Sequence, residues 1–106
     1  MTDRWVEAVK VGDIAENDVA KWDFENVSYA IFRLGHHEFY VTANICTHEH
    51  ALLSEGFLEN GVIECPRHSG RFDVKTGEPL GAPVCDAIRT FPVKVSGDTV
   101  LILLGA

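Results

Sequence analysis

The sequence predicts an all-β protein made of small antiparallel sheets. Short runs rich in β-branched and aromatic residues recur along the chain with turn residues between them, and helical periodicity is nearly absent. The runs cover residues 5–10, 19–24, 27–34, 38–43, 62–65, 88–96 and 99–104. Runs of this length and spacing are typical of a small antiparallel β-sandwich, so we expect such a sandwich as the base of the fold.

The residues between the runs have the composition of tight turns. Residues 25–26, Glu-Asn, join two runs, and Gly35 ends the run before residues 38–43. Residues 60–61, Asn-Gly, are a strong hairpin signal, because both positions of a two-residue type I′ turn need a positive φ. Residues 96–98, Ser-Gly-Asp, close the last hairpin. These turns predict that runs adjacent in sequence pair with each other as antiparallel strands.

Residues 44–83 differ from the rest of the chain. They contain few long strands, a segment rich in Gly and Pro at 76–83, two of the 3 cysteines and three of the 5 histidines. We expect this stretch to be a subdomain of loops and a hairpin, inserted into the β base. Since no linker or repeat divides the 106 residues, they are expected to form one domain, residues 1–106.

The charge balance excludes several classes of partner. Acidic residues outnumber basic ones 16 to 9, which gives a formal net charge of −7, and the basic residues are scattered. Nucleic acid and anionic membranes need clustered Lys and Arg, so neither is an expected partner. The N-terminus lacks the positive region of a signal peptide, and no apolar run approaches the length of a membrane span. We expect a cytoplasmic monomer.

Two Cys-His pairs form the chemical motif of the chain. The first is Cys46-Thr-His48, and the second is Cys65-Pro-Arg-His68. Residues 49–64 separate the pairs and include the Asn-Gly turn, so they can form a hairpin that brings the two loops together. Two thiolates and two imidazoles are then available from two loops.

Three interpretations of these four residues are open. In the first, the four residues are unrelated core and surface residues. In the second, they are the ligands of a closed tetrahedral zinc site. In the third, they are the ligands of a 2Fe–2S centre in which two histidines replace two cysteines on one iron. Two pairs at short spacing beside Pro and Gly argue against the first. Zinc fingers usually pair Cys with Cys, whereas here each loop supplies one residue of each kind, which suits the iron–sulfur centre.

The Cys46-x-His48 pair and residues 65–73, Cys-Pro-Arg-His-Ser-Gly-Arg-Phe-Asp, resemble the two cluster loops of the Rieske family. The resemblance extends over nearly the whole chain and implies the Rieske fold and one 2Fe–2S cluster. It implies that Cys46 and Cys65 bind the inner iron and that His48 and His68 bind the outer iron. His50, two residues after His48, is an alternative ligand by its position, but the family pattern assigns the first His. The cluster-covering and docking residues that it implies are Pro66, Arg67, Gly81 and Pro83.

The departures from the respiratory-chain members of the family are informative too. Those proteins have an additional, disulfide-linked Cys in each cluster loop, where this chain has Ala51 and Arg67. They also have Ser and Tyr hydroxyls that donate to sulfur, where this chain has Gly70 and Phe72. Because such donors stabilise the reduced cluster, we expect a potential toward the low end of the Rieske range of about −150 to +300 mV. This pattern resembles the soluble ferredoxins of aromatic-ring dioxygenases.

That resemblance implies a one-electron carrier in aromatic hydrocarbon catabolism. Its partners would be a flavin-containing NAD(P)H-dependent ferredoxin reductase and a terminal Rieske oxygenase. We expect no catalytic residues, because the chain is too short for a second domain with mononuclear iron and has no Gly-x-Gly-x-x-Gly fingerprint. Cys85 is expected to be a small core residue. The alternatives are a Rieske small subunit of another reductase and a zinc-binding protein-interaction module.

Overall fold

The computed structural model describes residues 3–47, 51–67, 70–81 and 86–105. In these residues the regular structure consists of antiparallel strands and two short 3-10 helices, with no α-helix. The all-β prediction is therefore confirmed. No helix in the described part of the chain is long and apolar enough to cross a membrane.

The strands form three sheets. The base sheet has the order β1 (Arg4–Lys10), β10 (Thr99–Leu104), β9 (Val93–Ser96). The central sheet has the order β2 (Asp18–Phe24), β3 (Val27–Arg33), β4 (Phe39–Ala43), β8 (Thr90–Phe91). The upper sheet has the order β5 (Phe57–Glu59), β6 (Val62–Glu64), β7 (Arg71–Asp73). The 3-10 helices are η1 (Val11–Asp13) and η2 (Leu53–Glu55).

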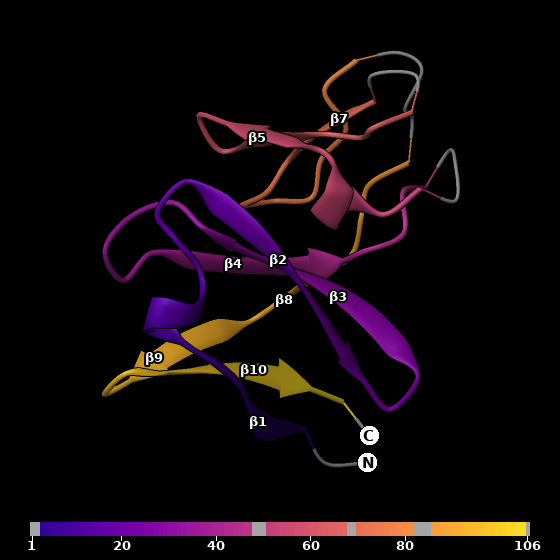
Figure 1. The fold of residues 1–106 in the computed structure, drawn as a ribbon. Coiled ribbons are helices and arrows are strands. Elements are labelled where there is room, and N and C mark those ends of the chain that lie inside the picture. The colour runs from indigo at the N-terminus through magenta and orange to yellow at the C-terminus, as the bar shows by residue number, and fades with distance from the viewer. Residues whose placement is uncertain (1–2, 48–50, 68–69, 82–85, 106) are drawn as a thin grey trace.

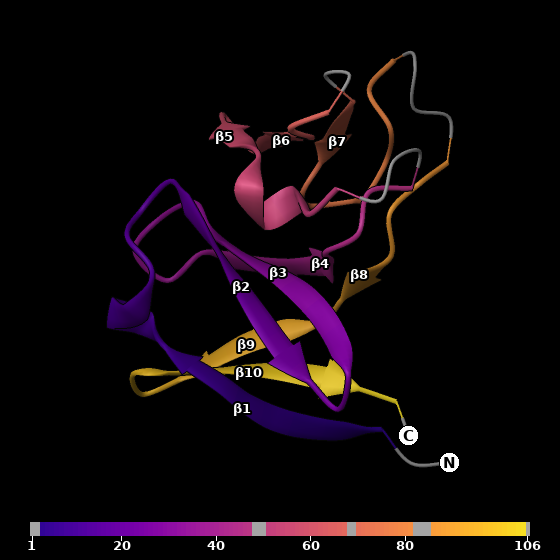
Figure 2. The same ribbon diagram turned by 45° about the vertical axis from the view of Figure 1, so that its right-hand side comes forward.

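The central sheet lies between the other two, so the domain has three layers (Figures 1 and 2). The middle strand β3 is buried on both faces, because successive side chains of a strand point to opposite sides. Tyr29 and Ile31 lie in a base core with the base sheet, whereas Ala30 and Phe32 lie in an upper core under the upper sheet. Both cores therefore rest on one strand, and this joins the upper sheet firmly to the base.

The predicted hairpin turns are present. Glu25 and Asn26 have φ values of 50° and 68°, and Asn60 and Gly61 have 51° and 77°. Positive φ at both central residues is the requirement of a type I′ turn, so each pair of residues connects two antiparallel strands directly. The Asn60–Gly61 turn joins β5 to β6, as the sequence predicts.

Two features differ from the sequence prediction. The run at 88–96 is not one strand: β8 pairs with β4 of the central sheet, β9 pairs with β10 of the base sheet, and Pro92 separates them. Pro92 has no N–H for a ladder, and its carbonyl accepts a hydrogen bond from the Leu103 amide at 3.0 Å. The short strand β7 was not predicted, because three residues show no periodicity without their partner β6.

Candidate metal centre

The first loop of the site follows β4 and is closed by its own backbone. The Cys46 amide donates a hydrogen bond to the carbonyl of Ala51 at 2.9 Å, and Ile45 forms an isolated β-bridge with Leu52. The Cys46 side chain is only 3% exposed. The loop therefore begins with an inward-pointing thiol on a short, hydrogen-bonded stem.

Asn44, at the root of this loop, fixes the stem to the rest of the domain. Its side chain is fully buried and donates hydrogen bonds to the hydroxyls of Ser28 at 3.0 Å and Ser54 at 2.9 Å. Its side-chain oxygen accepts a bond from the Ser54 amide at 2.8 Å, and its carbonyl accepts one from the Leu53 amide at 2.7 Å. One amide side chain thus links β3, the loop stem and η2, with all its hydrogen-bonding groups in use.

The second loop lies at the end of the β6–β7 hairpin. Glu64 pairs with Arg71 as the last register pair, and the chain then leaves the sheet at Cys65. The Cys65 amide donates to the carbonyl of Gly70 at 2.6 Å, and the Cys65 side chain is 1% exposed. Cys65 therefore has the same position in its loop as Cys46 has in the first.

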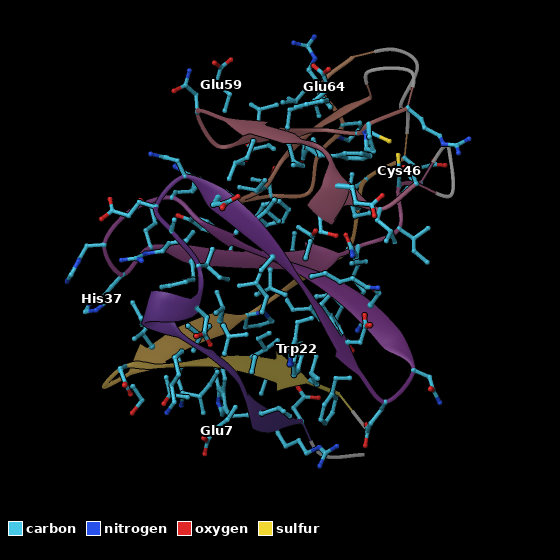
Figure 3. All side chains as sticks on the ribbon, in the orientation of Figure 1. Glu7, Trp22, His37, Cys46, Glu59 and Glu64 are labelled. Carbon is cyan, nitrogen blue, oxygen red and sulfur yellow. The ribbon has the colours of Figure 1, made fainter. Side chains whose placement is uncertain are left out.

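The two loops share one closure. In each, the amide of the cysteine donates to the carbonyl five residues later, Ala51 in one and Gly70 in the other. Both cysteines belong to the upper core, together with Leu53, Ile63 and Phe72 among others. Figure 3 shows Cys46 at the level between the central and upper sheets. Two loops from different hairpins thus place two buried thiols in the same core.

A third segment lies against the loops. The hydroxyl of Thr47, next to Cys46, donates to the carbonyl of Asp86 at 3.0 Å. The Leu80 amide donates to the carbonyl of Arg71 at 2.9 Å, and Pro79 forms a bridge with Phe72. The described residues on either side of the predicted covering segment are therefore bonded to the site: Leu80 to β7, and Asp86 to the first loop.

The structure describes most, but not all, of the predicted site residues. Cys46 and Cys65 are brought into one core, and Pro66, Arg67 and Gly81 are exposed. The predicted ligands His48 and His68, the docking residue Pro83, and both His50 and Cys85 lie outside the described residues. Within the described ranges, no group of three His, Cys, Asp or Glu side chains forms a metal site.

The described residues fit the cysteine side of a 2Fe–2S cluster. Soft thiolate ligands suit such clusters, and here apolar neighbours shield two thiols from water. The identical loop closures give each cysteine a defined backbone position, which is what ligands from separate loops need in order to meet at one centre.

Asn44 is the residue whose role sequence reasoning missed. A polar residue that directly follows a strand run and lies two residues before a candidate ligand is a usable signal. Its partners Ser28 and Ser54 are 16 and 10 residues away in sequence, however, and no local pattern pairs them with Asn44, so only the fold reveals the network.

The three-layer β fold and the paired cysteine loops define the class of protein, a cluster-binding β domain. The chain matches the profile of the Rieske [2Fe-2S] domain over residues 4–92. It belongs to this family, and its cofactor is one Rieske 2Fe–2S cluster. Family membership decides between the zinc and iron–sulfur interpretations in favour of the cluster.

Among characterised proteins, the chain is similar to the ferredoxin components of the naphthalene 1,2-dioxygenase systems of Pseudomonas aeruginosa and Pseudomonas putida. Each is 47% identical over 102 residues, which is 96% of this chain and 97% of the relative. The resemblance to dioxygenase ferredoxins is thereby confirmed.

Two solved structures have the same fold. The ferredoxin of Sphingomonas yanoikuyae B1 superposes with a TM-score of 0.89 at 29% identity and covers 96% of this chain and 100% of its own. A chain of the complex of reduced oxygenase and oxidized ferredoxin in carbazole 1,9a-dioxygenase gives a TM-score of 0.87 at 34% identity, with 92% and 91% covered.

Proposed function

We propose that this protein is a one-electron carrier that takes electrons from a flavin-containing NAD(P)H-dependent ferredoxin reductase. It passes them to the terminal oxygenase of an aromatic-ring dioxygenase system. The proposal is supported by similarity over nearly the full length to ferredoxin components of such systems. The observation that carries it is the pair of buried cysteines, each at the start of a loop with the same backbone closure.

The proposed ligands are Cys46 and Cys65 on the inner iron and His48 and His68 on the outer iron. The burial of both cysteine side chains, 3% and 1% exposed, supports the inner assignment. The cluster, when bound, supplies reversible storage of one electron. The protein's contribution is to fix the two loops and to keep water from the sulfur side.

The proposed docking tip contains Pro66, Arg67, Gly81 and Pro83. Two exposed apolar residues are neighbours of the site in sequence. Leu80, which is 39% exposed, precedes the tip residue Gly81, and Ile45, which is 48% exposed, precedes the proposed ligand Cys46. Exposed apolar residues around an electron port favour short-lived association with partner proteins. The residues 44–83 then form the cluster-binding subdomain of one domain, residues 1–106.

The carrier role assigns no catalytic residue and no substrate site to this chain. Substrate would be oxidised on the partner oxygenase, and pyridine nucleotide on the partner reductase. We infer that the protein works in the cytoplasm as a monomer, between partners that it meets in turn. The alternative, a Rieske small subunit of another reductase, would stay with one partner, and the similarity to ferredoxin components favours the carrier.

Reconstitution tests this function directly. The reductase and oxygenase components of the naphthalene dioxygenase system of Pseudomonas putida are mixed with NADH and naphthalene, with and without this protein. We expect product only when the protein is present, and none when Cys65→Ser replaces it, because the cluster loses a ligand. Product formation at the same rate without the protein, or with Cys65→Ser, would contradict the function.

A further inference from the structure

The upper sheet has one face in the core and one face toward solvent. Leu58, Ile63 and Phe72 lie abreast in the strand register and pack in or against the upper core. Side chains alternate along a strand, so the neighbouring positions point outward. The outward positions are Phe57, Glu59, Val62, Glu64, Arg71 and Asp73.

Phe57 is the feature of this outer face that packing does not explain. It is 67% exposed, more than any other exposed large hydrophobic side chain in the described part of the chain. It lines a hollow of about 260 Å³, whose other lining residues include Glu59, Val62, Glu64 and Arg71. An exposed ring beside a polar-rimmed hollow is a feature of protein interaction surfaces.

Two of the three carboxylates of the outer face, those of Glu59 and Glu64, are available to a partner, whereas Asp73 accepts a hydrogen bond from the Lys75 amide at 2.9 Å. Among the described residues, no ion pair involves Glu59 or Glu64. Figure 3 shows both side chains at the top of the molecule, pointing away from the central sheet. Arg71 is the one basic residue on this face, and the chain as a whole carries −7. The face is therefore complementary to a basic protein surface.

The outer face also begins at the metal centre. Phe57 pairs with Glu64, and Glu64 is followed directly by Cys65. The Asn60–Gly61 turn marks the opposite end of the same hairpin. A partner that contacts Phe57 and Glu64 would therefore also lie next to the start of the second cluster loop at Cys65.

We propose that Phe57, Glu59 and Glu64, called here the outer-face patch, form a docking surface for the terminal oxygenase. The oxygenase would supply an apolar socket for the Phe57 ring, bordered by Lys or Arg side chains for the two carboxylates. The inference rests on the proposed function and extends it by naming a contact surface beyond the predicted tip.

Charge favours the oxygenase over the reductase as the occupant. A reduced cluster carries one more negative charge than an oxidised one, so a basic surface binds the reduced carrier more tightly, and by linkage releases the oxidised carrier more readily. An electron acceptor needs that preference, because it must bind the reduced carrier and release the oxidised one. An electron donor needs the reverse.

The test measures the affinity of the intact, cluster-loaded protein for the naphthalene dioxygenase oxygenase of Pseudomonas putida, by calorimetry, at low and high ionic strength. Phe57→Ala should weaken binding at least about tenfold, as expected for a central aromatic anchor. Glu59→Gln and Glu64→Gln should weaken binding at low salt and reduce its salt dependence. Trp5→Ala and Glu7→Gln, matched exposed residues on β1 of the base sheet, should change affinity less than twofold.

Several outcomes would overturn the proposal. If Phe57→Ala binds the oxygenase as tightly as Trp5→Ala does, the outer-face patch is not in the interface, and the proposed carrier function is unaffected. Weakened binding to the reductase alone, or a change only in self-association on gel filtration, would assign the patch to another occupant. Failure of the wild-type protein to bind either component would overturn the proposed function itself. Unchanged optical spectra of the variants establish that the cluster is intact.

Discussion

At the residue scale, the geometry of the first loop depends on side chains that are not proposed ligands. Asn44 uses two N–H donors and its oxygen to hold Ser28 and Ser54, and so fixes the stem of the loop that carries Cys46. Each buried polar group left without a partner costs about 1–3 kcal/mol. The network thus stabilises one loop geometry strongly, since any other arrangement leaves several such groups unpaired.

Replacing Asn44 with Ala should destabilise the protein and loosen cluster binding. The Ser54 amide loses its acceptor and both hydroxyls lose a donor, so we expect a loss of about 2 kcal/mol or more and a fall in Tm of about 8 °C or more. Ser28→Ala, which keeps the Ser54 contacts, should cost about half as much. Thermal unfolding, monitored by the visible absorption of the cluster, measures the Tm of both variants. A Tm of Asn44→Ala within about 2 °C of the wild-type value would contradict this role of Asn44.

At the element scale, turns were more predictable than short strands. The Asn60–Gly61 hairpin was predictable because its two residues tolerate positive φ, which is a local property. By contrast, β7 exists because Ile63 and Phe72 face the same core and pair across the hairpin, and the break at Pro92 depends on which sheet each half joins. These are tertiary properties, which no run of residues encodes by itself.

Gly77 shows how one element connects the site to the base. Its amide donates to the Asp73 carbonyl at 2.7 Å, and its carbonyl accepts from the Ile88 amide at 2.8 Å, which fixes the segment entering β8. Gly77 has φ +80°, and a Cβ there would collide with the carbonyl oxygen of Ile88. A larger residue at this position would therefore be destabilised twice, by the strain of the positive φ and by the collision with Ile88.

Gly77→Ala should destabilise the protein much more than Gly97→Ala. Gly97 also has a positive φ, +62°, but has open space around its Cβ position, so its replacement costs only the backbone strain of about 1–2 kcal/mol. Gly77→Ala adds the collision with the Ile88 backbone to the same strain. The free energy of unfolding should therefore fall by at least about 3 kcal/mol in total. Denaturation of the two variants side by side measures the difference, and equal losses would show that the close approach to Ile88 is unimportant.

At the scale of the whole molecule, the architecture separates support from chemistry. The base sheet, which contains the first strand β1 and the last strand β10, lies at one end of the molecule, and the upper sheet lies at the other, above the central sheet (Figures 1 and 2). The sequence was sufficient to predict the β strands of the base and the two segments that bring Cys46 and Cys65 into one core, because both are marked by local patterns. It was not sufficient to predict the three layers, since a strand such as β3, buried on both faces, reads as an ordinary apolar run.

We propose that the two loops hold one 2Fe–2S cluster, with the cysteines on one iron and the histidines on the other. The most direct test is electron paramagnetic resonance of the purified protein before and after reduction by dithionite. We predict a red-brown protein that is silent when oxidised and gives a rhombic signal of one spin per two irons when reduced. The wild-type signal should carry couplings from two nitrogen ligands, and His68→Cys should keep only the coupling from His48. A colourless protein, or a reduced signal without nitrogen coupling, would contradict the account.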